Sequence, residues 1–92
     1  MIVRILGEGQ WTLPSERLDE LNDLDAALTD SVDTGDEARF ARDLATLLDR
    51  VRAVGVPVPV ESISTSDLIL PGPDAALAEV RALLGDEGLI PG

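Results

Sequence analysis

Two short stretches of this 92-residue chain carry residues that could support chemistry, and the first is a glycine-rich turn near the start. Gly7-Glu8-Gly9 follows an apolar run, as does the G-x-G-x-x-G loop whose bare backbone approaches a dinucleotide pyrophosphate. Thr12 stands where the third glycine belongs, Pro14 separates the turn from the next helix, and Glu8 would repel a phosphate. The pattern indicates a tight turn, and no cofactor is expected.

The second stretch is acidic and could in principle supply oxygen ligands to calcium or magnesium. Its members are Asp30, Asp33, Asp36 and Glu37. An EF-hand loop that began at Asp30 would place Val32 at the third ligand position and Ala41 where the bidentate glutamate belongs. The stretch is better explained as a solvated turn with helix-capping carboxylates, so no metal site is expected.

The composition removes most of the side chains on which enzymes rely. The chain contains no His, Cys, Tyr or Lys, so it has no thiol nucleophile, no disulfide framework and no zinc site of the familiar kind. Carboxylates are abundant, but no His or Lys stands beside one to tune its protonation. The sequence predicts a protein that is not an enzyme.

Trp11 and the arginines of the second predicted helix are the residues best suited to binding a protein partner. Trp11, the only tryptophan, could be a core anchor or an interface hot spot, and the core is favoured. Four of the seven cationic residues lie on that helix: Arg39, Arg42, Arg50 and Arg52. A solvated face balanced by Asp43 and Asp49 is the simpler explanation, and pairing with acidic side chains of a partner helix is the alternative. The candidate partner surface is Trp11, Arg39, Arg42 and Arg50.

Periodic apolar residues predict the elements that must position these side chains. Residues 2–6 and 10–13 alternate as two short strands, and Pro14 and Ser15 favour a helix start with Ser15 as its cap. Two helical stripes follow, Leu18, Leu21, Leu24, Leu28 and Val32, and then Phe40, Leu44, Leu47, Leu48 and Val51. The turn formers of residues 33–36 separate them, Thr34 and Glu37 fit a capping box, and Gly55 is a natural stop. An antiparallel αα-hairpin is expected.

The rest of the chain predicts one more strand and one more helix. Residues 56–60 (VPVPV) predict a stiff connector or a sheet edge, and residues 67–70 a strand. A last helix presents Ala76, Leu77, Val80, Leu83 and Leu84 and ends at Gly85, and Leu89 and Ile90 suggest a docked tail. We expect a single α+β domain over residues 1–92, a three-stranded sheet covered by three helices in the order ββααβα.

The formal net charge of −11 limits the classes of partner. It repels phosphate backbones and anionic lipid headgroups, so neither nucleic acid nor direct membrane insertion is expected. No run approaches the roughly 20 apolar residues that span a bilayer, and no basic segment precedes an apolar one at the start. A soluble, cytoplasmic protein is expected, and a cationic protein partner is allowed.

Three motifs together resemble the PspA-associated (PspAA) family: residues 1–11 (MIVRILGEGQW), residues 67–71 (DLILP) and residues 87–92 (EGLIPG). They occur in the right order and at fitting separations, and the resemblance covers essentially the whole chain. This family, mostly actinobacterial and archaeal, is typically encoded near a homologue of phage shock protein A, a coiled-coil protein that protects stressed inner membranes. No catalytic residue of the family carries over to this sequence.

The resemblance implies an accessory protein of the envelope stress response that binds or modulates a PspA-family coiled coil. Recruitment to the inner membrane would then occur through that partner. The alternative is a structural domain that forms a homodimer through a strand edge or the αα-hairpin and does not contact PspA directly.

Overall fold

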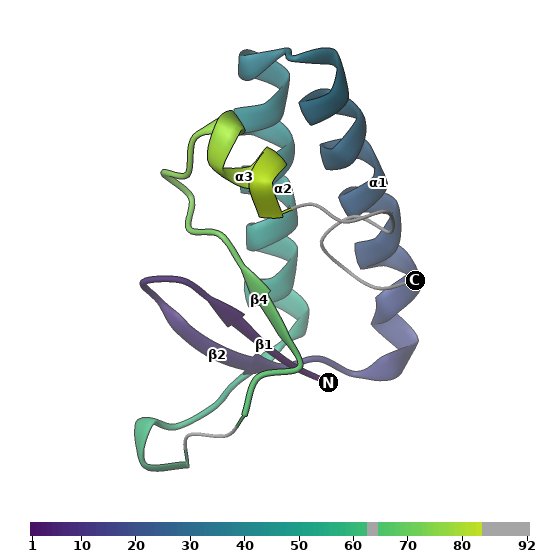
Figure 1. Ribbon diagram of the computed structural model, residues 1–92. Coiled ribbons are helices and arrows are strands. Elements are labelled where there is room, and N and C mark those ends of the chain that lie inside the picture. The colour runs from purple at the N-terminus through teal and green to yellow at the C-terminus, as the bar shows by residue number, and fades with distance from the viewer. Residues whose placement is uncertain (63–64, 84–92) are drawn as a thin grey trace.

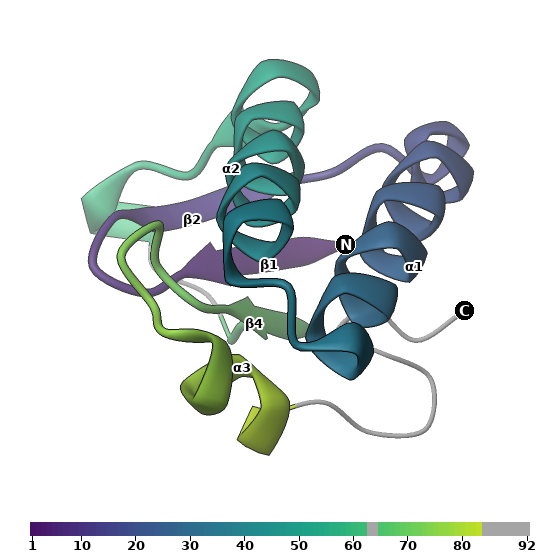
Figure 2. The same cartoon turned by 90° about the horizontal axis from the view of Figure 1, so that it is seen from above.

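The structure is a computed structural model that describes residues 1–62 and 65–83. The strands are β1 (Ile2–Ile5), β2 (Gly9–Thr12), β3 (Val56–Pro57) and β4 (Leu68–Leu70). The helices are α1 (Leu18–Thr34), α2 (Glu37–Val54) and α3 (Leu77–Leu83), with short 3₁₀ turns at Ser15–Arg17 and Val60–Ser62. Helices α1 and α2 form the expected antiparallel hairpin, and α3 lies against this hairpin next to α2 (Figures 1 and 2).

The sheet has four strands in the order β3-β2-β1-β4, so the predicted three-stranded sheet and the order ββααβα are wrong in detail. The additional strand is β3, which pairs antiparallel with β2 and gives the order ββααββα. Pro57 is tolerated because β3 is an edge strand, where no neighbour requires its missing N–H. Past the proline, Val58 N donates to Gln10 O at 2.9 Å and extends the pairing.

Strand β4 joins the opposite edge and runs parallel to β1. Asp67, just before β4, makes two hydrogen bonds to Ile2 at the start of β1. Its backbone N donates to Ile2 O at 2.8 Å, and its carboxylate accepts from Ile2 N at 2.8 Å. The hairpin between β1 and β2 turns through residues 6–8, where Gly7 has a φ of +84°. The glycine pair is therefore a turn, as predicted.

The helix boundaries differ from the predicted ones in two places. Pro14 precedes the 3₁₀ turn with no side-chain cap, so Ser15 does not cap a helix. Helix α1 runs on through Thr34 and ends at Gly35, whose φ of +74° is the left-handed conformation of a C-cap. Asp36, and not Thr34, caps α2, since its carboxylate accepts a hydrogen bond from Arg39 N at 3.0 Å.

The core lies between the α1–α2 hairpin and one face of the sheet. The predicted stripe of α2 is wholly buried, and Leu21, Leu28 and Val32 of α1 join it. Val3 and Ile5 complete the core from the sheet side. Helix α3 adds Val80, and Arg81 Nη2 donates to Val32 O at the end of α1 at 2.7 Å. Leu84, Gly85 and the tail, predicted as the end of the last helix and a docked segment, lie outside the described residues.

Candidate functional site

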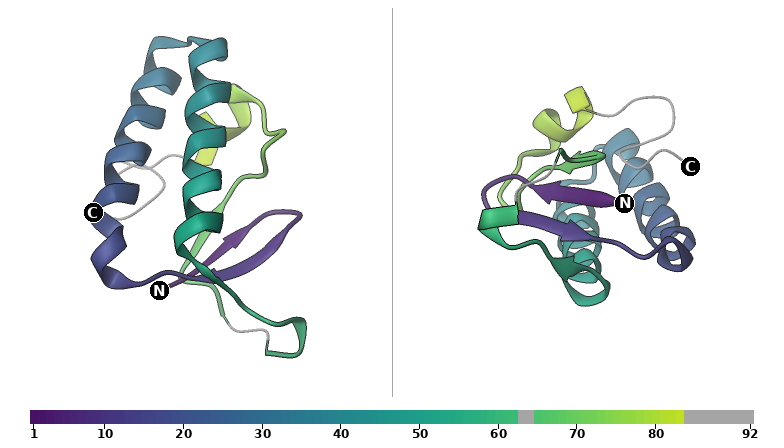
Figure 3. Two further views of the ribbon diagram at one scale, coloured as in Figure 1. Left: turned by 180° about the vertical axis from the view of Figure 1, so that it is seen from behind. Right: turned by 90° about the horizontal axis from the view of Figure 1, so that it is seen from below.

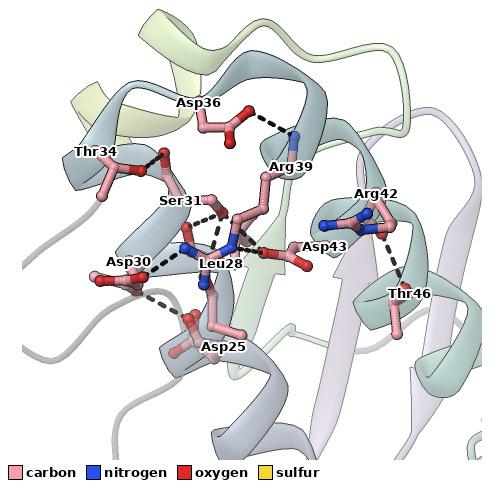
Figure 4. A network of polar contacts seen from close by, with 12 residues as sticks. Asp25, Leu28, Asp30, Ser31, Thr34, Asp36, Arg39, Arg42, Asp43 and Thr46 are labelled. Atoms are coloured by element: carbon pink, nitrogen blue, oxygen red, sulfur yellow. Dashed lines mark hydrogen bonds and ion pairs between the residues drawn. The ribbon is translucent and has the colours of Figure 1, made fainter.

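Arg39 at the start of α2 is held by carboxylates of its own chain (Figure 4). Its Nη1 lies 2.6 Å from Asp30 Oδ2 on α1, and its Nε lies 3.4 Å from Asp43 Oδ2 one turn later. The hydrogen bond to Asp30, followed by the attraction of nearby carboxylates, raises the pKa of the Arg39 guanidinium above its ordinary value. Asp30, considered above as a metal ligand, is thus an ion-pair partner between the two helices.

Arg50 and Arg52 near the end of α2 are engaged in the same way. Arg50 Nη2 pairs with Glu20 Oε1 on α1, while its Nε is buried and has no hydrogen-bond partner among the residues that the structure describes. Arg52 Nη2 lies 2.5 Å from Glu8 Oε2 in the hairpin turn, and its Nη1 lies 2.8 Å from Asp49 Oδ1. Three arginines of α2 therefore connect this helix to α1 and to the β1–β2 turn.

Arg42 differs from these three arginines. It is exposed on α2, and its backbone carbonyl accepts a hydrogen bond from Thr46 Oγ1 at 2.9 Å (Figure 4). Within residues 1–62 and 65–83 its side chain makes no ion pair. Arg42 can meet an external carboxylate without the loss of an internal one.

Ser31 on α1 makes a polar contact with α2. Its side chain is fully buried, and Oγ lies 2.9 Å from Leu28 O and 3.0 Å from Asp43 Oδ2 (Figure 4). A hydroxyl has one proton to donate, so the buried oxygen is satisfied by either acceptor. The hydrogen bond from Ser31 to Asp43 joins α1 to α2, while Asp43 also pairs with Arg39 on its own helix.

Trp11 lies on the helix side of the sheet, directly opposite Val3 in the pairing of β1 with β2. Its side chain is partly buried and packs against the hydrophobic core. It also borders the end of α2, because a Cβ placed on Gly55 would come within 2.9 Å of the Trp11 Cβ. The four candidate partner residues therefore lie at the two ends of α2. Arg39 and Arg42 are near its start, and Arg50 is near its end, where Trp11 of β2 approaches it.

Acidic clusters and pockets are the remaining features of the described residues where a site could lie. In the described part of the chain, no group of three or more acidic side chains could hold a metal ion. One open pocket of about 260 Å³ lies near the start of α3, lined by Leu6, Pro71, Gly72, Asp74, Ala75 and Glu79. Its titratable groups are two carboxylates, with no base or nucleophile beside them. None of the described helices is both long enough and apolar enough to span a bilayer.

Arg4 is a further candidate that the sequence analysis passed over. It lies on β1 between Val3 and Ile5, which are both fully buried against the helices. Since side chains alternate along a strand, Arg4 points to the outer face of the sheet. Like Arg42, it forms no ion pair with any residue that the structure describes. The signal was present in the sequence as a single charge inside an apolar run.

These features define a small acidic α+β domain in which a helical hairpin covers one face of a four-stranded mixed sheet. The family model PspAA, described as PspA-associated protein, matches residues 1–92, and the chain therefore belongs to the PspAA family. The resemblance drawn from the three sequence motifs is confirmed over the whole chain. Neither a curated protein nor a solved structure matches the chain.

Proposed function

We propose that this protein is a non-enzymatic accessory module that binds a PspA-family coiled coil and modulates its assembly or activity in the envelope stress response. The observation that carries the proposal is membership of a family described as PspA-associated, with a match that spans residues 1–92. We propose a cytoplasmic location with recruitment to the inner membrane through the partner, because a net charge of −11 opposes direct contact with anionic lipid.

The side-chain chemistry supports a binding role. The chain has no His, Cys, Tyr or Lys, and several of its carboxylates are engaged in structure. Asp36 caps α2, while Asp30, Glu20 and Glu8 accept ion pairs from arginines. These groups stabilise a rigid surface, which suits recognition of another protein.

Trp11, Arg39, Arg42 and Arg50 form one proposed contact surface along α2. Arg39 and Arg50 would have to exchange internal carboxylates for those of a partner, at a cost in stability of this domain. Arg42 would not, because it is exposed and makes no ion pair within the described residues. Arg42 is therefore the residue that tests this surface most directly.

The experiment mixes the purified protein with a PspA homologue from the same genome. Co-sedimentation and light scattering should show binding and a change in the size of the PspA assemblies. The absence of both effects at low and at moderate salt would overturn the proposal. A matched run with bovine serum albumin in place of this protein controls for non-specific acidic proteins.

A second candidate function is a homodimeric structural domain without direct PspA contact. Val56 and Ile69, which are 65% and 54% exposed on the two edge strands, favour it as apolar surface that a second copy could cover. Sedimentation at tens of micromolar, the order of concentration at which weak dimers form, should then show a dimer. A monomer under these conditions would exclude this candidate.

A further inference from the structure

The outer face of the sheet, turned away from α1 and α2, carries a small apolar surface around one arginine. Seen from below, β4, β1 and β2 lie in front and α2 lies behind them (Figure 3, right). The strand registers place two rows on this face. The first row of side chains runs from Ile69 through Arg4 to the buried Gln10, and the second from Ile2 through Thr12 to Val56. The outer patch below consists of Ile2, Arg4, Thr12, Val56 and Ile69.

Alternation along the strands separates the outer patch from the core. Val3, Ile5 and Leu70 are fully buried on the helix side, and their neighbours Arg4 and Ile69 therefore point outward. Two of the three large apolar residues that the structure records as exposed, Val56 and Ile69, belong to this patch. Gln10 bounds the patch on one side, where it is only 6% exposed and donates to Ser66 Oγ at 2.8 Å.

Arg4 lies between Ile69 on β4 and Gln10 on β2, two residues from Ile2 on its own strand, and is only partly exposed. The chain has 18 acidic residues against seven basic ones, and four other arginines are paired with carboxylates. Arg4 makes no such pair among residues 1–62 and 65–83. A guanidinium among aliphatic side chains binds a carboxylate more strongly than one in open water, because less solvent screens the pair.

The net charge decides which occupant fits the outer patch. A second copy would bring two chains of charge −11 together over a small area, and nucleic acid or an anionic lipid surface would be repelled by the same charge. An amphipathic helix that carries one carboxylate within its apolar stripe matches both the apolar side chains of the patch and the charge of Arg4. Its apolar side chains would cover Ile2, Val56 and Ile69, and its carboxylate would pair with Arg4.

We propose that the outer patch is the docking site for such an amphipathic helix of the PspA partner. This inference rests on the proposed function and names the surface and the partner chemistry that it requires. Five side chains are far fewer than the roughly 20 residues on each side of a stable interface, so a transient complex is expected. The carboxylate–Arg4 pair fixes the position of the helix, and the aliphatic side chains supply the burial.

The absence of cysteine allows the patch to be mapped one position at a time. The variants Ile69→Cys and Val56→Cys place a single thiol on the patch, and Ala45→Cys places one on the exposed side of α2. Alkylation by iodoacetamide is followed with and without the PspA homologue. Docking on the patch slows alkylation at positions 69 and 56 at least threefold and leaves position 45 within a factor of 1.5. Protection at position 45 alone would overturn the inference.

Charge reversal supplies the second measurement. Arg4→Glu should weaken co-sedimentation about tenfold, while Arg17→Glu, the same change in charge at a 51% exposed side chain outside both proposed surfaces, should leave it within twofold. Arg42→Glu tests the α2 surface in the same assay. Ile69→Thr, which keeps a β-branched residue, should weaken binding about threefold. Denaturation curves establish that each variant is folded.

The outcomes separate this inference from the proposed function. If the wild type binds and only Arg42→Glu weakens the complex, the contact surface is on α2, so the inference is wrong and the proposed function stands. If the wild type does not bind the PspA homologue, both are wrong. If Arg4→Glu instead dissociates a dimer of this chain, the patch binds a second copy and the inference is overturned.

Discussion

The carboxylate of Glu8 accepts two parallel hydrogen bonds from the guanidinium of Arg52, from Nε at 2.8 Å and from Nη2 at 2.5 Å. The pair joins the turn between β1 and β2 to the last turns of α2, across 44 residues of sequence. The bidentate geometry is the strong form of the carboxylate–arginine interaction. The two side chains are 27% and 31% exposed, so the pair is only partly screened by solvent. Glu8, the charged residue of the glycine turn, therefore helps to fix the position of the β1–β2 hairpin relative to α2.

A double-mutant cycle with Glu8→Gln and Arg52→Gln should give a coupling free energy of about 0.5–1 kcal/mol. Urea denaturation followed by the fluorescence of Trp11 measures it. The pair Arg17–Glu20 is a matched control, because its atoms lie 3.6 Å apart and its side chains are 51% and 36% exposed. Its coupling should be near zero, and equal couplings for the two pairs would contradict the structural role of Glu8.

The same pair predicts a pH dependence of stability. The hydrogen bond from Arg52 lowers the pKa of Glu8 below its ordinary value of 4.5, and the attraction of the guanidinium acts in the same direction. A carboxylate with a lowered folded-state pKa stabilises the fold above its unfolded-state pKa and loses this contribution as the pH falls through the folded-state pKa.

The stability difference between the wild type and Glu8→Gln should be constant from about pH 7 to 5.5. It should shrink as the pH falls below the ordinary pKa of 4.5, because the wild-type carboxylate then becomes protonated. Denaturation curves at half-unit pH steps measure the difference. A gap that widens as the pH falls would show that the pKa of Glu8 is raised and not lowered.

Asp36→Ala should destabilise the protein by about 1 kcal/mol, because the hydrogen bond to Arg39 N at the start of α2 is lost. Thr34→Ala is the control, since Thr34 is the last residue of α1 and its hydroxyl donates to Ser31 O at 3.2 Å within that helix. Its effect should be a few tenths of a kcal/mol. A larger loss of stability for Thr34→Ala than for Asp36→Ala would support the capping box predicted from the sequence.

Gly55→Ala should cost about 1–3 kcal/mol through crowding, although the backbone at Gly55 is extended and suits any residue. A Cβ there would lie 2.7 Å from Val51 O and 2.9 Å from the Trp11 Cβ. Gly35→Ala should cost about 1 kcal/mol for a different reason, the positive φ of +74°, since no atom lies within 4 Å of its Cβ.

Asparagine distinguishes the two causes. Gly35→Asn should recover most of the loss at position 35, because asparagine tolerates the left-handed conformation. Gly55→Asn should be no better than Gly55→Ala, because its Cβ meets the same atoms. Thermal unfolding of the four variants measures both comparisons, and recovery at position 55 would exclude crowding as the cause.

The features that follow local rules were predictable. The stripe of α2 was placed residue by residue because a period of 3.6 is visible within one helix. Gly7 lies in a turn and Gly35 ends a helix, both with positive φ, as is common for glycine. The predicted capping box of Thr34 and Glu37 is wrong, because Asp36 caps α2. The arginines of α2 were recognised as a group, and Asp43 and Asp49 as carboxylates that balance them, which is confirmed by the pairs Arg39–Asp43 and Arg52–Asp49. Their partners Glu8 and Glu20 were not recognised, because these lie far from them in sequence.

The sequence by itself determined the family, the αα-hairpin, the glycine turn and the acidic character of the surface, since composition, short motifs and helical periodicity record them. Only the tertiary structure decided that Val56–Pro57 pairs with β2, that β4 runs parallel to β1, and that Arg4 lies on the outer face of the sheet without an ion pair to any described residue. These relationships join segments more than 40 residues apart. They depend on how the helices close over one face of the sheet, which no local pattern records.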